Sequence, residues 1–149
     1  MKTKKRISIF GYGTTTKPLA KHIPNAVFYD DNCSETYEGL DGSFVRPSSE
    51  FNENNSDLEI TSPGIPPFNP LIKKAKNLIS EYDYFWDASP FKIWISGTNG
   101  KTTTTQMTQH LLEDKGSLAG GNIGTALGDL DQSAKIWILE TSSFTMHYT

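Results

Sequence analysis

Short, mostly apolar runs, each followed by turn-forming residues, recur along the first half of the chain and predict buried β-strands. They are Ile7–Phe10, Ala26–Tyr29 and Leu58–Thr61. A short helical stretch is predicted around Pro18–His22, because proline fits the first turn of a helix. Apolar residues at 71, 72, 75, 78 and 79 recur at helical spacing and predict a helix from Pro70 to Glu81. Strands that alternate with helices are typical of a parallel α/β sheet.

The pattern restarts in the second half and predicts a second, incomplete α/β unit. Four aromatic residues between Tyr82 and Pro90 are interpreted as an edge strand followed by a linker. A domain boundary is therefore expected near residues 89–92, which divides the chain into 1–90 and 91–149. The second unit is expected to contain a strand at Ile93–Ser96, a helix at about Thr102–Lys115, a glycine-rich turn at 120–124 and a strand at Ile136–Leu139 that ends in Glu140.

The composition is that of a globular protein with a slight excess of acidic residues. Hydrophobic residues make up 36% of the 149 residues, and the net charge is -3. A nucleic-acid partner is disfavoured, because proteins that bind nucleic acids present a basic face. No apolar run is long enough to cross a bilayer, so no membrane insertion is expected. The single cysteine, Cys33, allows no internal disulfide and suits a reducing cytoplasm.

The stretch Gly97–Thr103, GTNGKTT, follows a predicted strand, leads into a predicted helix and is typical of a phosphate-binding loop. Glycine lets backbone N–H groups approach an anion at the positive end of a helix. In such a loop a lysine adds a positive charge at the outer phosphates, and the hydroxyl of the next residue ligates Mg²⁺. Lys101 and Thr102 stand at these two positions. The loop is shorter than the usual form, whose first glycine would stand at Ile95. A glycine turn into a threonine-capped helix is the alternative, and it leaves Lys101 unexplained.

Glu140 supports the interpretation as a nucleotide site. It follows the apolar run Ile136–Leu139, so it is expected at the carboxyl edge of a parallel sheet, near the phosphate loop. A carboxylate there can hold Mg²⁺ directly or through water. The alternative is an ordinary exposed loop residue.

A second glycine loop stands near the start of the chain. Gly11 and Gly13 follow a predicted strand, and Asp30 lies 19 residues beyond Gly11, which nearly meets the dinucleotide-binding fingerprint. The third glycine would fall at Thr16, so the usual close packing of helix on strand is not expected. The hydroxyls of Thr14 and Thr15 are candidates to bind a phosphate, with Asp30 on a ribose or a base edge. The alternative is a glycine turn without a ligand.

Several motifs stand in order along the chain: GYGTTT at 11–16, TSPGI at 61–65, GTNGKTTTT at 97–105, and GGNIGTAL at 120–127 followed by ETSSF at 140–144. Together they resemble the Mur ligases of peptidoglycan synthesis over nearly the whole chain. The phosphate loop is shared across that superfamily. The Ser-Pro-Gly-Ile, Gly-Gly-Asn-Ile-Gly and Glu-x-Ser-Ser-Phe motifs are typical of the members that add D-glutamate.

The resemblance implies a fold and a reaction. Residues 1–90 would form a Rossmann-like parallel-sheet domain that binds the UDP end of the substrate, and 91–149 would begin a P-loop α/β domain that binds ATP. With ATP and Mg²⁺, the full-length enzyme would phosphorylate the carboxylate of UDP-N-acetylmuramoyl-L-alanine, and the amine of D-glutamate would attack the acyl phosphate. A cytoplasmic monomer is implied. The chain itself would be an amino-terminal fragment without ligase activity.

The resemblance also implies roles for residues, matched position by position. Catalytic roles would fall to Lys101 and Glu140, and the metal would be held by Thr102 and Glu140. ATP would be bound by Gly97, Thr98, Asn99, Gly100, Lys101, Thr102 and Thr103. The UDP-linked substrate would be bound by Gly13, Thr14, Thr15, Asp30, Asp31, Gly64 and Asn122. Some relatives have an arginine where Asn32 stands, so this wall of the uridine pocket is expected to differ.

Other classes of function remain open from the sequence. A folylpolyglutamate synthetase-like ligase shares the short phosphate loop, but residues 1–90 argue against it because it would not begin with a separate nucleotide-binding domain. A stand-alone UDP- or NAD-binding module is another class. Binding of NAD without binding of UDP would favour such a module. A P-loop regulatory switch would bind nucleotide but has no use for the SPGI and GGNIG motifs.

Overall fold

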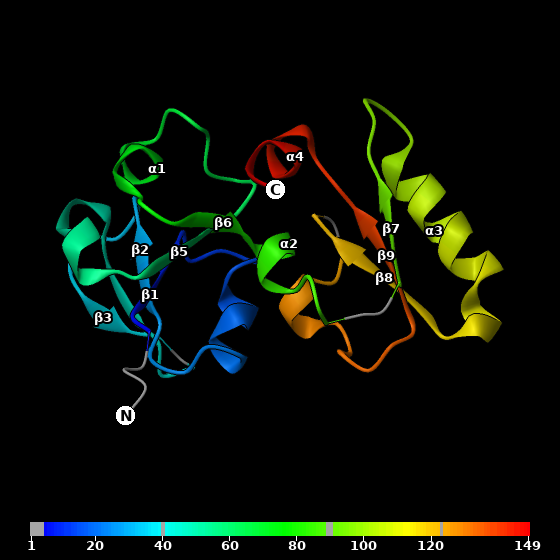
Figure 1. The fold of residues 1–149 in the computed structure, drawn as a ribbon, viewed down its shortest axis with the longest axis horizontal. Coiled ribbons are helices and arrows are strands. Elements are labelled where there is room, and N and C mark those ends of the chain that lie inside the picture. The colour runs from blue at the N-terminus through cyan, green and yellow to red at the C-terminus, as the bar shows by residue number, and fades with distance from the viewer. Residues whose placement is uncertain (1–4, 40, 89–90, 123) are drawn as a thin grey trace.

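Two β-sheets organise the chain in the computed structural model, which describes residues 5–39, 41–88, 91–122 and 124–149. Within these ranges the first sheet has six strands in the order β3-β4-β2-β1-β5-β6, and the second has three in the order β7-β9-β8. All paired strands are parallel except β3 and β4. Figure 1 shows the two sheets on either side of α2 and α4. None of the helices in the described ranges is long and apolar enough to cross a membrane.

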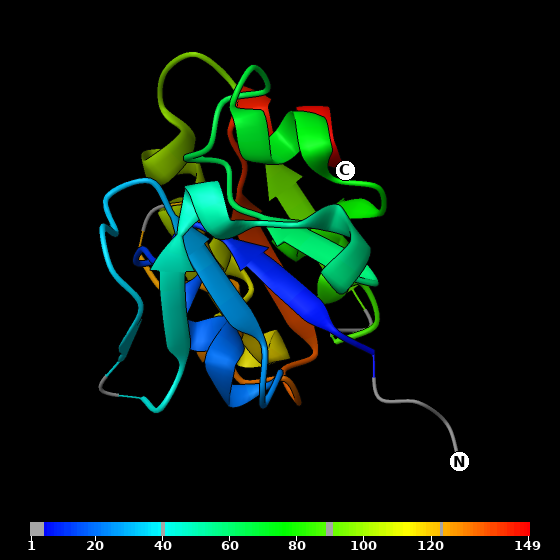
Figure 2. The same ribbon diagram turned by 90° about the vertical axis from the view of Figure 1, so that its left-hand side faces the viewer.

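The first sheet is built around β1, whose residues Ser8–Phe10 are buried between β2 and β5 (Figure 2). Its strands are β1 Ile7–Phe10, β2 Val27–Asp30, β3 Tyr37–Glu38, β4 Phe44–Pro47, β5 Leu58–Thr61 and β6 Leu78–Ser80. The three predicted apolar runs are confirmed as strands, β2 with a shift of one residue. The connecting helices are short: 3-10 turns at Lys17–Lys21, Ser48–Glu50 and Glu53–Asn55, and the α-helices α1 Pro70–Lys74 and α2 Glu81–Tyr84.

The predicted helix from Pro70 to Glu81 is wrong beyond Lys74. Ala75 is extended, with φ -62° and ψ 138°. Buried Glu59 of β5 then accepts hydrogen bonds from the N–H groups of Lys76, at 3.2 Å, and Asn77, at 2.8 Å. Leu78–Ser80 follow as strand β6 beside β5. The apolar residues at helical spacing therefore belong to a helix first and to a strand afterwards. The strand forms because the edge of β5 has backbone groups that need hydrogen-bond partners.

The predicted edge strand within Tyr82–Pro90 is also wrong, because this segment begins in α2. Ser80 and Asp83 form a reciprocal capping box at its N-terminus: the Ser80 hydroxyl accepts from the Asp83 N–H, and the Asp83 carboxylate accepts from the Ser80 N–H. The aromatic residues of this segment therefore lie on a helix and its following turn. The predicted boundary near 89–92 falls partly on residues 89–90, which lie outside the described ranges.

The second sheet consists of β7 Phe91–Ile95, β8 Ser117–Gly121 and β9 Ile136–Glu140. Helix α3, Lys101–Leu111, is followed by a 3-10 turn at Glu113–Lys115, and a further 3-10 turn covers Leu127–Asp129. The predicted strands β7 and β9 and the helix α3 are confirmed, although α3 ends four residues before the predicted Lys115. Strand β8 was not predicted: Gly120 and Gly121, expected in a turn, form its end. Helix α4, Ser143–Tyr148, completes the described chain.

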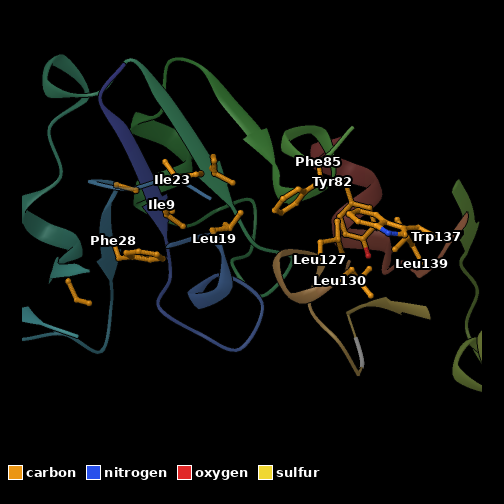
Figure 3. Close-up of a cluster of buried hydrophobic side chains, with 13 residues drawn as sticks. Ile9, Leu19, Ile23, Phe28, Tyr82, Phe85, Leu127, Leu130, Trp137 and Leu139 are labelled. Atoms are coloured by element: carbon orange, nitrogen blue, oxygen red, sulfur yellow. The ribbon is translucent and has the colours of Figure 1, made fainter. Parts of the chain in front are cut away.

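One cluster of buried apolar side chains extends across both sheets (Figure 3). Tyr82 of α2 and Phe85, which directly follows α2, lie between Ile9 of the first sheet and Trp137 of the second, and the rings of Phe85 and Trp137 are 6.2 Å apart. Buried apolar area is the main stabilising contribution to a fold, so this shared core couples the two sheets. The division into domains at 1–90 and 91–149 stays a prediction.

Polar contacts add to this packing at one end of the shared core. The carbonyl of Gly128 lies 2.7 Å from Nε2 of His22, and a Cβ at Gly128 would lie 2.8 Å from Cβ of Pro18. Lys21 and Asp129 form an ion pair at 2.6 Å. The turns Lys17–Lys21 and Leu127–Asp129 therefore pack directly on each other.

Candidate functional site

The predicted motifs lie at the carboxyl ends of parallel strands, where α/β proteins bind their ligands. In the second sheet, Ile95 of β7 and Gly121 of β8 both pair with Glu140 of β9. The phosphate-loop motif begins at Gly97, two residues after Ile95, and Asn122 directly follows Gly121. The register of this sheet thus brings the phosphate loop, Glu140 and Asn122 to one edge.

The loop from Ser96 to Gly100 is exposed and leads into the N-terminus of α3. Gly100 is the N-cap of the helix and has φ 75°, a left-handed conformation that only glycine adopts at little cost. The first N–H groups of a helix have no partner within it, so they are available to an anion. The ammonium of Lys101 donates a hydrogen bond to the carbonyl of Gly97 at 2.9 Å and so folds back over the loop. Loop amides, helix N-terminus and ammonium group together place positive charge and N–H donors at one point, the combination that binds phosphate.

Thr102 and Glu140 meet beneath this loop. The Thr102 hydroxyl donates a hydrogen bond to Oε2 of Glu140 at 2.9 Å, and Glu140 is only 2% exposed. Mg²⁺ prefers oxygen ligands and usually takes one or two from the protein, with phosphates and water completing its shell. Across the described residues no group of three or more His, Cys, Asp or Glu side chains is placed to hold a metal. A hydroxyl beside one carboxylate therefore fits an Mg²⁺ that shares its ligands with a nucleotide.

Around Glu140 the chain is packed too closely for a side chain at Gly121. A Cβ there would lie 2.4 Å from the carbonyl oxygen of Glu140 and 2.7 Å from the hydroxyl of Tyr82, and Gly121 has φ 117°. The same carbonyl accepts hydrogen bonds from the Tyr82 hydroxyl, at 2.7 Å, and from the Asn122 N–H, at 3.1 Å. Burial raises the pKa of Tyr82, so its hydroxyl stays protonated and a donor. Tyr82 of α2 thus fixes the end of β9.

The first glycine loop is held together by Asp30 and Thr16. The Asp30 carboxylate accepts hydrogen bonds from the N–H groups of Tyr12, at 2.6 Å, and Asn32, at 2.8 Å. The Thr16 hydroxyl donates to the Gly11 carbonyl at 2.7 Å and accepts from the Gly13 N–H at 3.0 Å. Thr16 therefore closes the loop with its hydroxyl where the usual fingerprint has a glycine. Asp30 therefore fixes the shape of the loop. Each of its two carboxylate oxygens keeps a further lone pair that can accept a hydrogen bond from a ligand.

The remaining residues predicted to bind substrate surround this loop. Thr14 is exposed and Thr15 is half-buried. The turn Ser62–Ile65, which contains Gly64, covers Gly11: a Cβ there would lie 3.4 Å from Cδ1 of Ile65. The carboxylate of Asp31 accepts a hydrogen bond from the amide of Asn69 at 2.7 Å, which ties it to the N-cap of α1. The first-sheet residues of the predicted site thus belong to one connected group of loops.

Three residues near the site were missed by the sequence analysis. Tyr82 contacts Glu140 as described above, and Glu81 beside it is buried. Tyr148 of α4 donates a hydrogen bond to the carbonyl of Ile65 at 2.8 Å. The cluster of aromatic residues from Tyr82 onward was visible in the sequence, but its assignment to an edge strand hid the contact with β9. The motif GGNIG includes Ile123, which lies outside the described residues.

Curated proteins from two organisms are similar to the chain over nearly its whole length. No family model matches the chain. The chain is 54% identical over 148 residues to a UDP-N-acetylmuramoylalanine–D-glutamate ligase of Campylobacter jejuni, with 97% of this chain and 37% of the relative covered. It is 47% identical over 154 residues to the ligase of the same name from Helicobacter pylori, with 97% and 36% covered. The chain thus spans little more than a third of the length of these relatives.

A solved structure supports the fold. The crystal structure of the UDP-N-acetylmuramate:L-alanyl-gamma-D-glutamyl-meso-diaminopimelate ligase from Neisseria meningitides matches with a TM-score of 0.50 at 18% identity. The match covers 95% of this chain and 55% of that one. Over nearly its whole length the chain is thus similar to the D-glutamate ligases of Campylobacter and Helicobacter, and the architecture of its described residues matches that of a Mur ligase.

Proposed function

We propose that the chain is the substrate- and nucleotide-binding part of an ATP-dependent ligase that joins D-glutamate to UDP-N-acetylmuramoyl-L-alanine. Its relatives at 54% and 47% identity carry the name of that ligase. Residues 1–90 would hold the UDP-linked substrate, and 91–149 would hold ATP and Mg²⁺. The proposal places the chain in the cytoplasm, as part of an enzyme that acts as a monomer.

The observation that carries the proposal is the arrangement of Gly100, Lys101, Thr102 and Glu140. A glycine-capped helix N-terminus, an ammonium group above it and a hydroxyl–carboxylate pair at 2.9 Å below it are the parts that a Mg²⁺–triphosphate needs. The predicted UDP-binding loops lie at the carboxyl edge of the other sheet, whose core is shared with this one.

When bound, Mg²⁺–ATP would supply a phosphoryl group to the substrate carboxylate, which is a poor electrophile until it is phosphorylated. The chain's own residues would position the phosphates and the cation and would offset the charge of the phosphates. The amides after Gly97 and the ammonium of Lys101 would hold the outer phosphates and stabilise the charge that develops on them. Thr102 and Glu140 would hold the cation from the protein side. Asn122, which follows the end of β8 at the same edge, would orient the UDP-linked substrate toward the phosphate loop.

The proposal is tested by calorimetry on the whole 149-residue chain. Wild-type chain is expected to bind Mg-ATP and, separately, UDP-N-acetylmuramoyl-L-alanine. Replacing Lys101 with alanine removes a charge-assisted contact and should weaken Mg-ATP binding by about ten- to a hundredfold, with binding of the UDP-linked substrate unchanged. Lys115→Ala, an exposed lysine beyond α3, is the matched control and should bind both ligands as wild type does.

Absence of heat with either ligand at millimolar concentration would overturn the proposal. Binding of NAD without binding of UDP would instead favour a stand-alone dinucleotide-binding module. In the full-length parent enzyme, Lys101→Ala should lose most ligase turnover and keep its affinity for the UDP-linked substrate. Unchanged turnover there would remove Lys101 from the mechanism.

A further inference from the structure

Helix α4 lies between the two groups of predicted substrate-binding loops (Figure 1). It starts after Ser142, whose hydroxyl caps the helix by accepting a hydrogen bond from the Thr145 N–H at 3.1 Å. Its six residues, Ser143–Tyr148, connect the edge of the second sheet to loops of the first. None of the sequence motifs assigned a role to the second half of this helix.

The beginning of α4 is bonded to the second sheet. Thr145 is buried, and its hydroxyl donates a hydrogen bond to Oδ1 of Asn122 at 3.3 Å. Asn122 in turn is held by its N–H on the carbonyl of Glu140. The amide side chain that would touch the UDP-linked substrate therefore has its orientation set by α4.

The end of α4 is bonded to the first sheet. The hydroxyl of Tyr148 donates to the carbonyl of Ile65 at 2.8 Å, and the hydroxyls of Thr149 and Ser80 are 2.8 Å apart. Ile65 closes the turn that begins at Ser62, with its N–H on the Ser62 carbonyl, and its side chain packs over Gly11. Tyr148 thus holds the turn that contains Gly64 against the first glycine loop.

We propose that Tyr148 is a positioning residue that sets the spacing between the turn at Gly64 and the side chain of Asn122. This inference rests on the proposed function, which places the two ends of one UDP-linked substrate at these two points. A ligand that spans both points gains from their fixed spacing, because the protein is preorganised before binding. A ligand that reaches only the first-sheet loops gains little from it.

The test compares two ligands on the whole chain. Tyr148→Phe removes the hydroxyl and keeps the ring. It should weaken binding of UDP-N-acetylmuramoyl-L-alanine by about three- to tenfold, the usual worth of one hydrogen bond, while UDP alone changes by less than about twofold. Mg-ATP binding should not change. Tyr84→Phe is the matched control, since Tyr84 lies on α2 with its ring against Phe85, and it should leave both UDP ligands unaffected.

Each outcome has a distinct meaning. Equal weakening of UDP and of the UDP-linked substrate would overturn the role in spacing, as would no change in either. If the wild-type chain binds neither UDP nor UDP-N-acetylmuramoyl-L-alanine, the proposed function is overturned, and this inference with it. If Tyr148→Phe does not fold, Thr145→Val removes the bond at the other end of α4 and should show the same selective loss; an unselective effect there would overturn the inference.

Discussion

Glu81 is predicted to make the stability of the chain strongly dependent on pH. Its side chain is 1% exposed, and neither of its carboxylate oxygens has a hydrogen-bond partner in the described part of the chain. Burial raises the pKa of Glu81 from 4.5 to about 8, because the charged form loses its hydration without gaining a partner. Glu81 is next to Tyr82, whose ring belongs to the core shared by the two sheets. A charge on Glu81 would therefore disturb the packing of α2 between the sheets.

The sign and size follow from linkage. The folded chain holds the proton of the Glu81 carboxyl more tightly than the unfolded chain does. The free energy of unfolding is therefore highest below pH 4.5 and falls as the pH rises toward 8. At one pKa unit per 1.36 kcal/mol, the loss amounts to roughly 5 kcal/mol above pH 8. That is a large fraction of the ~5–15 kcal/mol by which most domains are stable.

The perturbation is Glu81→Gln, which keeps the shape of the neutral acid but cannot ionise. Urea unfolding gives the free energy of unfolding of both proteins at pH 5 and pH 8.5. The variant should gain about 4 kcal/mol relative to wild type between these two pH values, because only wild type has to bury a charge or take up a proton. Glu35→Gln, at an exposed position, is the control and should show no such change. A difference between Glu81→Gln and wild type that is the same at both pH values would refute the reasoning.

Two further predictions concern the second sheet. Gly121→Ala should lower the free energy of unfolding by at least about 2 kcal/mol in urea titrations, because its Cβ would meet the Glu140 carbonyl at 2.4 Å and φ is 117°. Gly13→Ala, with no atom within 4 Å of its Cβ, is the control, and an equal loss in both would contradict the steric argument. Thr102→Val should weaken ATP binding about five- to tenfold in calorimetry with Mg²⁺ but hardly at all in EDTA, since the hydroxyl acts through the cation. The exposed Thr104→Val on the same helix should match wild type in both buffers.

Short-range pattern predicted some elements because the deciding forces are local. The strands β1 and β9 are nearly continuous apolar runs bounded by turn residues, so their burial is visible in the sequence. The Gly-Lys-Thr triplet was recognisable for the same reason: it depends on a glycine that adopts φ 75° and on its direct neighbours. Strand β8 was missed because two of its five residues are glycines, which usually mark a turn.

Contacts between distant residues decided the rest. Helix α1 ends at Lys74 because the carboxylate of Glu59 and the edge of β5 capture the residues that follow. A long-range contact also gives Asp30 a structural role that was not predicted, since its carboxylate accepts a hydrogen bond from the backbone of the glycine loop. Neither bond is encoded by spacing along the chain, because both depend on which strands become neighbours.

By itself the sequence indicated a resemblance to the Mur ligases, most of the strand–loop–helix order and the types of group available at each loop. Glycines, hydroxyls, a lysine and carboxylates in a given order limit the chemistry, because backbone freedom and charge are properties of single residues. Only the tertiary structure decided that Thr102 faces Glu140, that Tyr148 reaches Ile65 and that Glu81 is buried without a partner. These facts depend on how two sheets pack around α2 and α4, and packing joins residues that no local pattern relates.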